Sequence, residues 1–299
     1  MKKLAVILAV GLMVSISLTS MALAGGSNTY TCNTRYPVIL AHGMGASTKV
    51  LGIVDYWWGI VPALQKQGAS VYCTTVNAMD STANKAASFK QQVMQIMAAT
   101  GAKKVNIIGH SHGTIYTRYA ISNLGLAPYV ASYTSLAGPH RGSSIASLIM
   151  YELPDWLLAA GGDVIDFVYA FIFGDTSPDS LQNALDICPD YMINTFNPNT
   201  PNMPGIYYQS WAAKAKTACP SVILNPTWLV MLVEEGANDG LVSVESAKWG
   251  NFRGVQEAAW YSTGCDHLNI VGQLFGVTPG FDAPQFFVDI VKDLKARGY

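Results

Sequence analysis

The chain has 299 residues, of which 50% are hydrophobic and only 12% are charged, and its formal net charge is −1. This length and composition allow a large core and fit a single α/β domain. The near-neutral balance, without any basic run or stripe, excludes an electrostatic nucleic-acid surface, so no nucleic-acid partner is expected.

The N-terminus has the pattern of a signal peptide over residues 1–24. Two lysines precede an apolar stretch from Leu4 to Val14, and Ala22-Leu23-Ala24 fits the small-x-small cleavage rule. The alternative is a membrane anchor, but the stretch is short for a span of about 20 residues. We therefore expect a mature chain of residues 25–299 that passes the periplasm and is secreted.

Export places the five cysteines in an oxidising compartment, where disulfides persist. Cys32 lies just before the first expected strand and Cys73 lies in the second, so they form a candidate disulfide if those strands are neighbours. Cys188 and Cys219 are a second candidate pair. The odd count, completed by Cys265, leaves at least one cysteine free or intermolecular, and the sequence does not fix the connectivity.

Strand and helix signals alternate from Tyr36 onward. The pattern predicts strands at Pro37–Leu40, Ser70–Val76, Lys104–Ile108 and Val130–Leu136. It predicts helices at Val54–Lys66, Asn84–Thr100 and Thr114–Asn123. This order predicts an α/β fold with a mostly parallel central sheet flanked by helices on both faces.

The alternation breaks between about residues 143 and 225. That range contains a very apolar, helix-like segment, Leu157 to Phe171. Strands are expected again at Trp228–Val233 and Ala258–Ser262, and an amphipathic helix at Pro284–Arg297 closes the chain. The sequence thus predicts one domain, residues 25–299, with a large insertion.

The pentapeptide Gly109-His110-Ser111-His112-Gly113 lies between an expected strand and an expected helix. This context is what a nucleophile elbow requires, because the tight turn exposes the serine hydroxyl at the carboxyl edge of the sheet. Ser111 is therefore the candidate nucleophile of a serine hydrolase. The alternative is an ordinary glycine-rich turn between a strand and a helix.

A serine hydroxyl needs a base, and the chain offers five histidines. His110 and His112 belong to the elbow itself, and their side chains do not turn back easily onto the serine. His42 and His140 lie in loops after strands. His267 alone lies near the C-terminus, where the hydrolase order serine, acid, histidine places the base. A capping or core histidine is the alternative role for His267.

The third member should orient the imidazole and stabilise its charged form. Asp239, in the turn Asn238-Asp239-Gly240, is the preferred candidate. Glu234 and Glu235 are rivals because they lie nearer to the expected strand. Asp266 directly precedes the candidate base, so its side chain should point elsewhere.

An oxyanion hole needs two backbone N–H groups beside the nucleophile. His112, the residue after the serine, supplies one. We assign the other to Met44, in the loop Ala41-His-Gly-Met-Gly45, whose glycines permit close approach of the backbone. The alternative is that this segment is only a flexible loop.

Several stretches together resemble the secreted bacterial true lipases of the Pseudomonas and Burkholderia type. The matches are Tyr36–Met44, Gly52–Trp57, Val105–Gly113, Gly138–Ser143, Asn238–Val242 and His267–Gln273, in the family's order. The resemblance implies a triacylglycerol lipase with an α/β-hydrolase fold. By position it makes Ser111, Asp239 and His267 the triad, and Met44 and His112 the oxyanion donors. It also makes part of the apolar insertion a helical lid, for which a plain core helix is the competing explanation.

The chain departs from this family at the positions of a structural calcium ion. The resemblance places the ligands at Asn225 and Asn269 and at the carbonyls of Gln273 and Val277. Both family aspartates are neutral amides here, and calcium prefers charged oxygens. We therefore expect little or no calcium at this position, and no other cofactor is required. Glu245 stands where the family has the second cysteine of its disulfide.

The expected partner is an ester or lipid substrate at an interface, contacted peripherally by a monomeric enzyme. A dedicated foldase chaperone is a further candidate partner. Short-chain esters, phospholipids and polyesters are alternative substrates. A lipid-binding protein without catalytic activity is the alternative from another class, and it would be expected to lack a triad member.

Overall fold

The computed structural model describes residues 30–44, 49–50, 54–77, 80–151, 178–273 and 275–299. The expected signal peptide and the apolar segment at 157–171 lie outside these residues. Among the helices described, none combines the length and the apolarity needed to cross a membrane.

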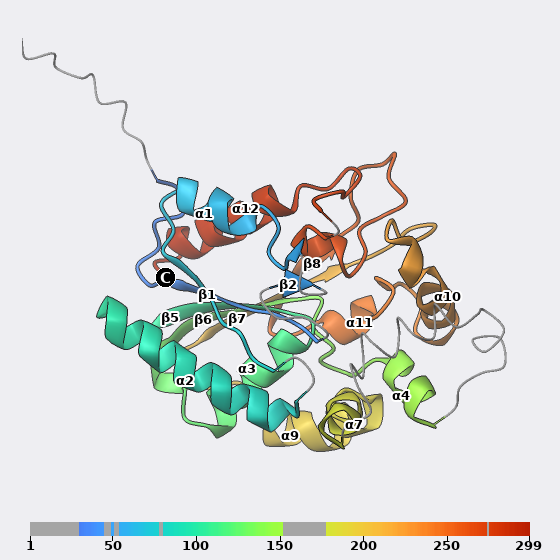
Figure 1. Cartoon of the computed structure of the whole chain (residues 1–299), viewed down its shortest axis with the longest axis horizontal. Helices are drawn as coiled ribbons and strands as arrows, with labels where there is room; N and C mark the ends of the chain where they lie inside the picture. Colours follow the sequence, from blue (N-terminus) through green and yellow to red (C-terminus); the bar gives the residue numbers. More distant parts are fainter. Residues whose placement is uncertain (1–29, 45–48, 51–53, 78–79, 152–177, 274) are drawn as a thin grey trace, which may run out of the picture.

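A six-stranded parallel sheet forms the centre of the described fold (Figure 1). Its order is β4 (Val71–Cys73), β1 (Val38–Ala41), β5 (Val105–His110), β6 (Val130–Leu136), β7 (Tyr207–Ala213) and β8 (Asn251–Gln256). Strands β1, β5 and β6 are buried along their whole length, as expected for parallel strands covered on both faces. The expected α/β class is confirmed.

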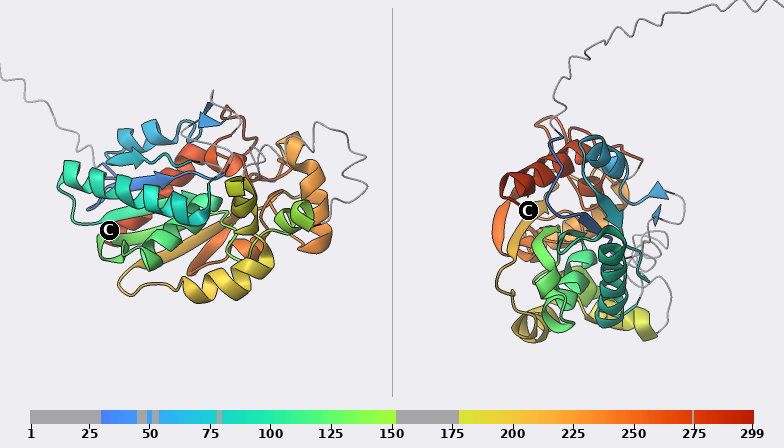
Figure 2. Two further views of the ribbon diagram at one scale, coloured as in Figure 1. Left: turned by 60° about the horizontal axis from the view of Figure 1, so that its bottom comes forward. Right: turned by 90° about the vertical axis from the view of Figure 1, so that its left-hand side faces the viewer.

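Two helix layers cover the sheet. Helices α1 (Ile60–Lys66) and α12 (Ala283–Ala296) lie on one side, and α2 (Thr82–Thr100) and α3 (His112–Asn123) on the other (Figure 2). Successive side chains of a strand point to opposite faces of the sheet and so contribute to two separate cores. Ile108, for example, packs with Leu64 and Phe287, whereas Ile107 packs with Phe89 and Tyr116.

The remaining elements are short and lie outside the six-stranded sheet and the four helices that cover it. They are β2 (Lys49–Val50), β3 (Val54–Asp55), α4 (Ser144–Tyr151), α7 (Pro178–Leu185), α8 (Pro189–Tyr191), α9 (Asn197–Asn199), α10 (Asn225–Glu234) and α11 (Val244–Ala247). A π-helical turn, η2, covers Met192–Phe196, and 3-10 turns are found at η1 (Ala127–Tyr129), η3 (Val222–Leu224) and η4 (Asn269–Val271).

Two expected strands near the C-terminus were wrong. The run from Trp228 to Val233 lies in helix α10, where Trp228 and Met231 are buried while Val233 is 83% exposed. A short apolar run does not distinguish a strand from a helix, but Pro226, two residues before this run and in the first turn of α10, favours a helix. Residues 258–262 lie in a loop with a turn at 260–261, and the strand of the sheet is β8, just before them.

The expected insertion is also shorter than residues 143–225. Strand β7 lies inside that range, and it pairs with β6 in parallel from Ser132↔Tyr207 to Leu136↔Trp211. The segment that departs from the α/β pattern therefore ends before Tyr207. Strand β7 reads Tyr-Tyr-Gln-Ser-Trp-Ala-Ala, which does not alternate polar and apolar residues, so it gives no clear strand signal after the Pro- and Asn-rich stretch.

The candidate disulfides were wrong as well, because all five cysteines are free. Strands β1 and β4 are indeed neighbours, but Cys73 is in register with Leu40, near the carboxyl end of β1. Cys32 lies before the other end of β1, and its thiol approaches the carbonyl of Val288 in α12 at 3.5 Å. The thiols of the second pair, Cys188 and Cys219, face the carbonyls of Ala184 and Asp239 instead.

Candidate active site

The predicted elbow joins β5 to α3 through a strained backbone. Ser111 has φ 56° and ψ −133°, a region that L-residues rarely adopt. Its N–H donates to the carbonyl of Leu136 at 3.0 Å, which ties the turn to β6. Gly113 must be a glycine, because a Cβ there would lie 2.2 Å from the carbonyl oxygen of Ala41. The close packing of α3 on β1 therefore depends on this missing side chain.

His267 and Asp239 form a buried pair, with 2.8 Å between Nδ1 and Oδ2. Each side chain is 1% exposed. The second carboxylate oxygen of Asp239 accepts the N–H groups of Leu241 and Val242 at 3.0 and 2.7 Å. Because these two N–H groups hold the carboxylate in place, the carboxylate fixes the orientation of the imidazole.

Of the rival acids, Glu234 is exposed at the end of α10, whereas Glu235 and Asp266 form other hydrogen bonds. Glu235 accepts the N–H of Ser144 at 2.7 Å. Asp266 accepts the N–H groups of Leu268 and Asn269 with one oxygen and that of Ser221 with the other, at 2.6–3.0 Å. The Asp266 carboxylate thus holds the loop around His267 in shape through backbone N–H groups, and burial raises its pKa above the usual value.

The His–Asp pair lies beside the elbow. The ring of His267 packs against that of His110 with 4.6 Å between centroids, and His110 directly precedes Ser111. Residues of the Asp239 turn, Leu241 and Val242, line the same recess as the serine. The structure therefore brings together Ser111, Asp239 and His267, which lie far apart in the sequence.

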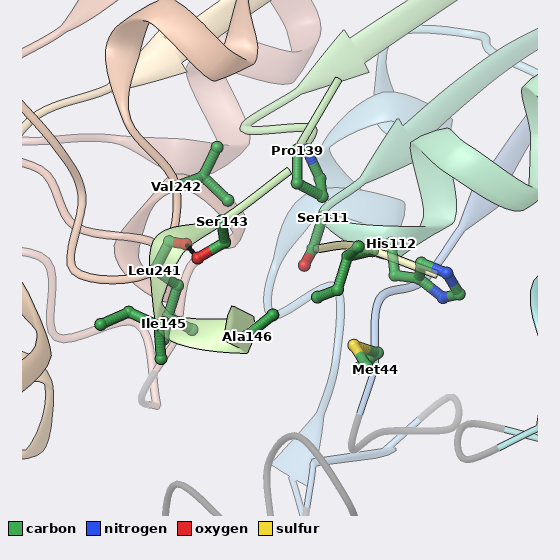
Figure 3. Close-up of a pocket in the computed structure, with 10 residues that line it drawn as sticks. Met44, Ser111, His112, Pro139, Ser143, Ile145, Ala146, Leu241 and Val242 are labelled. Atoms are coloured by element: carbon green, nitrogen blue, oxygen red, sulfur yellow. Dashed lines mark hydrogen bonds between the residues drawn. The ribbon is translucent and has the colours of Figure 1, made fainter. Parts of the chain in front are cut away.

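The loop after β1 packs directly on the nucleophile. A Cβ on Gly43 would lie 2.7 Å from the Cβ of Ser111 and 3.2 Å from its hydroxyl. Met44 follows and lines the recess with Ser111 and His112 (Figure 3). This contact places both candidate N–H donors next to the serine, and their role as donors stays a prediction.

Tyr56 fastens this loop, although no role for it was predicted. Its hydroxyl accepts the N–H of Gly43 at 2.9 Å and donates to Nδ1 of His110 at 2.5 Å. Burial raises the pKa of Tyr56 well above its usual value, so the phenol stays protonated and can donate. The resemblance included Tyr56 in its Gly52–Trp57 match, but a match alone does not show what a buried hydroxyl bonds.

A narrow apolar recess lies beside Ser111. Figure 3 shows its lining from the loops after β1, β5 and β6 and from α4. The lining residues are Met44, Ser111, His112, Pro139, Ser143, Ile145, Ala146, Ile187, Leu241 and Val242. A concave site with apolar walls and one reactive hydroxyl suits an acyl chain.

Two of the other histidines have structural roles. His42 accepts the N–H of Val76 at 3.1 Å, and burial lowers its pKa to about 4. His140 bonds the hydroxyl of Ser135 at 2.7 Å, lies 3.2 Å from Arg118, and has a pKa lowered by burial. Both rings are neutral hydrogen-bonding parts of the scaffold and do not compete with His267 as the base.

The two asparagines at the positions that the resemblance gives to calcium form hydrogen bonds within the chain. The amide oxygen of Asn225 accepts the N–H of Cys219 at 2.7 Å, and the amide nitrogen of Asn269 donates to the carbonyl of Gln273 at 2.8 Å. A donor group thus faces one of the expected carbonyl ligands. Val277 is 68% exposed. Among the described residues, no group of three or more histidine, cysteine or acidic side chains could hold a metal.

Comparisons with known proteins agree with this geometry. The family model described as the alpha/beta hydrolase fold matches residues 36–235. A triacylglycerol lipase of Vibrio cholerae is 32% identical over 269 residues, which cover 80% of this chain and 84% of that enzyme. One of Burkholderia plantarii is 36% identical over 198 residues, and the match spans 62% of this chain and about half (54%) of that relative.

Solved structures show the same fold. The mature form of the Bacillus licheniformis lipase BlEst2 superposes with a TM-score of 0.64 at 19% identity, over 86% of this chain and 91% of that one. The metagenomic carboxyl esterase MGS0156 gives 0.63 at 16% identity, over 88% and 76% of the two chains.

Proposed function

This chain belongs to the alpha/beta hydrolase family and is a serine carboxylester hydrolase of the lipase type, and from that premise we propose that it is a secreted triacylglycerol lipase whose triad is Ser111, Asp239 and His267. The observation that carries the triad is the buried pair of His267 and Asp239, 2.8 Å apart, beside a strained serine turn. A strained backbone at a strand-to-helix turn is typical of a catalytic nucleophile.

In the proposed reaction Ser111 attacks the ester carbonyl while His267 takes its proton. The N–H groups of Met44 and His112 stabilise the oxyanion, and Asp239 holds the imidazolium that forms. His267 then gives the proton to the leaving alcohol, which departs and leaves an acyl-serine. Water, activated by the same imidazole, releases the acid and restores the serine. The apolar recess next to Ser111 accepts the acyl chain.

Secretion is part of the proposal. It is supported by the signal-peptide pattern of residues 1–24 and by the relation to bacterial lipases. Four of the five free cysteines are compatible with an oxidising compartment, because burial raises the pKa of Cys32, Cys188, Cys219 and Cys265 and keeps their thiols unreactive. We further propose a monomer that contacts lipid peripherally and that takes a foldase chaperone as its partner during folding.

The experiment that tests the triad uses Ser111→Ala and a fluorophosphonate probe. The wild type should incorporate one probe per chain and hydrolyse a p-nitrophenyl ester, and the variant should do neither while keeping its melting temperature. Labelling of the variant at full rate would overturn the assignment. A wild type that takes no label would favour the lipid-binding alternative.

The substrate class needs a separate measurement, because a short-chain esterase, a phospholipase or a polyester hydrolase could use the same triad. Rates should be followed with esters of increasing chain length, below and above their solubility. A steep rise above solubility is expected for a lipase. A rate that saturates below solubility would identify an esterase, and release of soluble products from a polyester film would identify the third alternative.

A further inference from the structure

A buried lysine outside the triad lies next to the elbow. Lys85, on α2, is 1% exposed. Its amino nitrogen lies 3.1 Å from Nδ1 of His112 and 2.7 Å from the amide oxygen of Asn183, close to the end of α7. Lysine is rarely buried this deeply without a specific set of partners. Here the partners come from two other helices, so this amino group joins three separate segments of the chain.

The ring of His112 is held at both nitrogens. Nε2 lies 2.9 Å from the hydroxyl of Thr82, and Nδ1 faces Lys85. Burial lowers the pKa of His112 well below its usual value, so the ring is neutral and carries one N–H. Nδ1 then accepts from the lysine, and Nε2 donates to the threonine. The N–H of Thr82 in turn donates to Asp186 at 2.8 Å, which ties the same corner to the residue that follows α7.

The charge of the lysine suits this arrangement. Burial lowers the pKa of Lys85 to about 7, and Asp186 and Asp80 oppose that shift. The two acceptors, Nδ1 of His112 and the oxygen of Asn183, use two N–H bonds, which the neutral amine and the ammonium ion both provide. The contacts therefore persist on both sides of neutral pH.

His112 is the residue whose backbone N–H is assigned to the oxyanion hole. It follows the strained Ser111 and begins α3. Figure 3 shows its ring directed away from the serine, so the ring does not reach the substrate side. We propose that Lys85 is a positioning residue, which clamps the His112 ring onto α2 and α7 and thereby fixes the N–H that stabilises the oxyanion. This inference rests on the proposed function.

Lys85→Met tests the clamp, because methionine fills similar space without a donor. The number of intact sites is first counted by the endpoint of fluorophosphonate labelling, so that unfolded protein is not scored. Loss of a whole oxyanion donor costs about 10²–10³ in kcat, and a displaced donor should cost about 10-fold per labelled site, with KM changed less than about twofold. Lys90→Met is the matched control, since Lys90 lies on the same helix and donates to the carbonyl of Leu124 at 2.7 Å.

A double-mutant cycle separates positioning from general stability. If Lys85 acts through the imidazole, Lys85→Met should change kcat per site less than about twofold when His112 is already alanine. A loss of similar size in both backgrounds would overturn the clamp.

Thr82→Val serves if Lys85→Met does not fold, because it removes the bond to the other ring nitrogen. A folded Thr82→Val enzyme should also lose kcat without a matching change in KM, and unchanged kcat would overturn the inference. Failure of the proposed function is distinguishable, because the wild type itself would then take no label at Ser111.

Discussion

Replacing Tyr56 with phenylalanine should weaken both the fold and the catalysis, because a single hydroxyl oxygen joins two parts of the site. That hydroxyl accepts the N–H of Gly43 and donates to His110, and Tyr56 itself is buried. The substitution removes no packing atom other than the oxygen, so its effect reports on these two hydrogen bonds.

The magnitude follows from the groups left unpaired. A buried donor or acceptor without a partner costs about 1–3 kcal/mol, so the N–H of Gly43 and Nδ1 of His110 together should cost about 2–6 kcal/mol. In a domain of this size about 1 kcal/mol lowers Tm by roughly 2–4 °C, so Tm should fall by at least about 4 °C. Gly43 touches Ser111 and precedes Met44, so a released loop should also lower kcat about 10- to 100-fold.

Thermal unfolding and kinetics on a soluble p-nitrophenyl ester measure the two effects on one preparation. Tyr129→Phe is a matched control, because Tyr129 is 37% exposed and lies before β6, in η1. If Tyr56→Phe keeps its Tm within about 1 °C and its kcat within about twofold, the hydroxyl does not hold the loop and the reasoning is refuted.

Four further results are expected. Asp239→Asn should lower kcat by about 10⁴-fold with little change in Tm, as measured by ester hydrolysis, because the amide favours the wrong tautomer of the base. Gly113→Ala should destabilise the fold by about 3 kcal/mol in urea unfolding, because its Cβ would meet backbone oxygens at 2.2 and 2.7 Å. EDTA should leave Tm unchanged, since Asn269 already bonds the carbonyl that a calcium ion would need; a large drop that calcium reverses would contradict this. Between pH 7 and 10.5 the unfolded chain binds more protons at Lys85 than the folded chain, so folding should gain stability with rising pH, and Lys85→Met should lack that part of the gain.

The sequence predicted the parts of the fold whose signals are local. The strand predicted at Val130–Leu136 has these bounds in the structure. The helix predicted from Asn84 begins two residues earlier, at Thr82, because Ser81 is its N-cap. The strand–turn–helix context of Ser111 likewise needed only neighbouring residues. The helix at Trp228 was mistaken for a strand because six apolar residues in succession carry no period, and only packing decides which of them are buried.

The supporting contacts of the site could not be predicted, because each joins residues far apart in the chain. A lysine in an amphipathic helix is usually found at the surface, and nothing near Lys85 in the sequence indicates a partner at His112 or Asn183. Tyr56 was one aromatic residue among several in an apolar stretch. The cysteine pairing failed for the same reason, because neighbouring strands do not make residues at opposite ends of them neighbours.

The topology of the parallel sheet should limit the rate at which this chain folds to its active state. Every pairing in it joins strands that run in the same direction, so none can close through a short hairpin. High contact order of this kind slows folding, and strand edges stay unpaired while the chain folds. The border strand β8 precedes His267 in the chain, so we expect the loop of His267 to reach its final position only after β8 has paired with β7. During refolding, recovery of hydrolysis should therefore lag behind recovery of helix content, and the length of that lag measures the docking of β8.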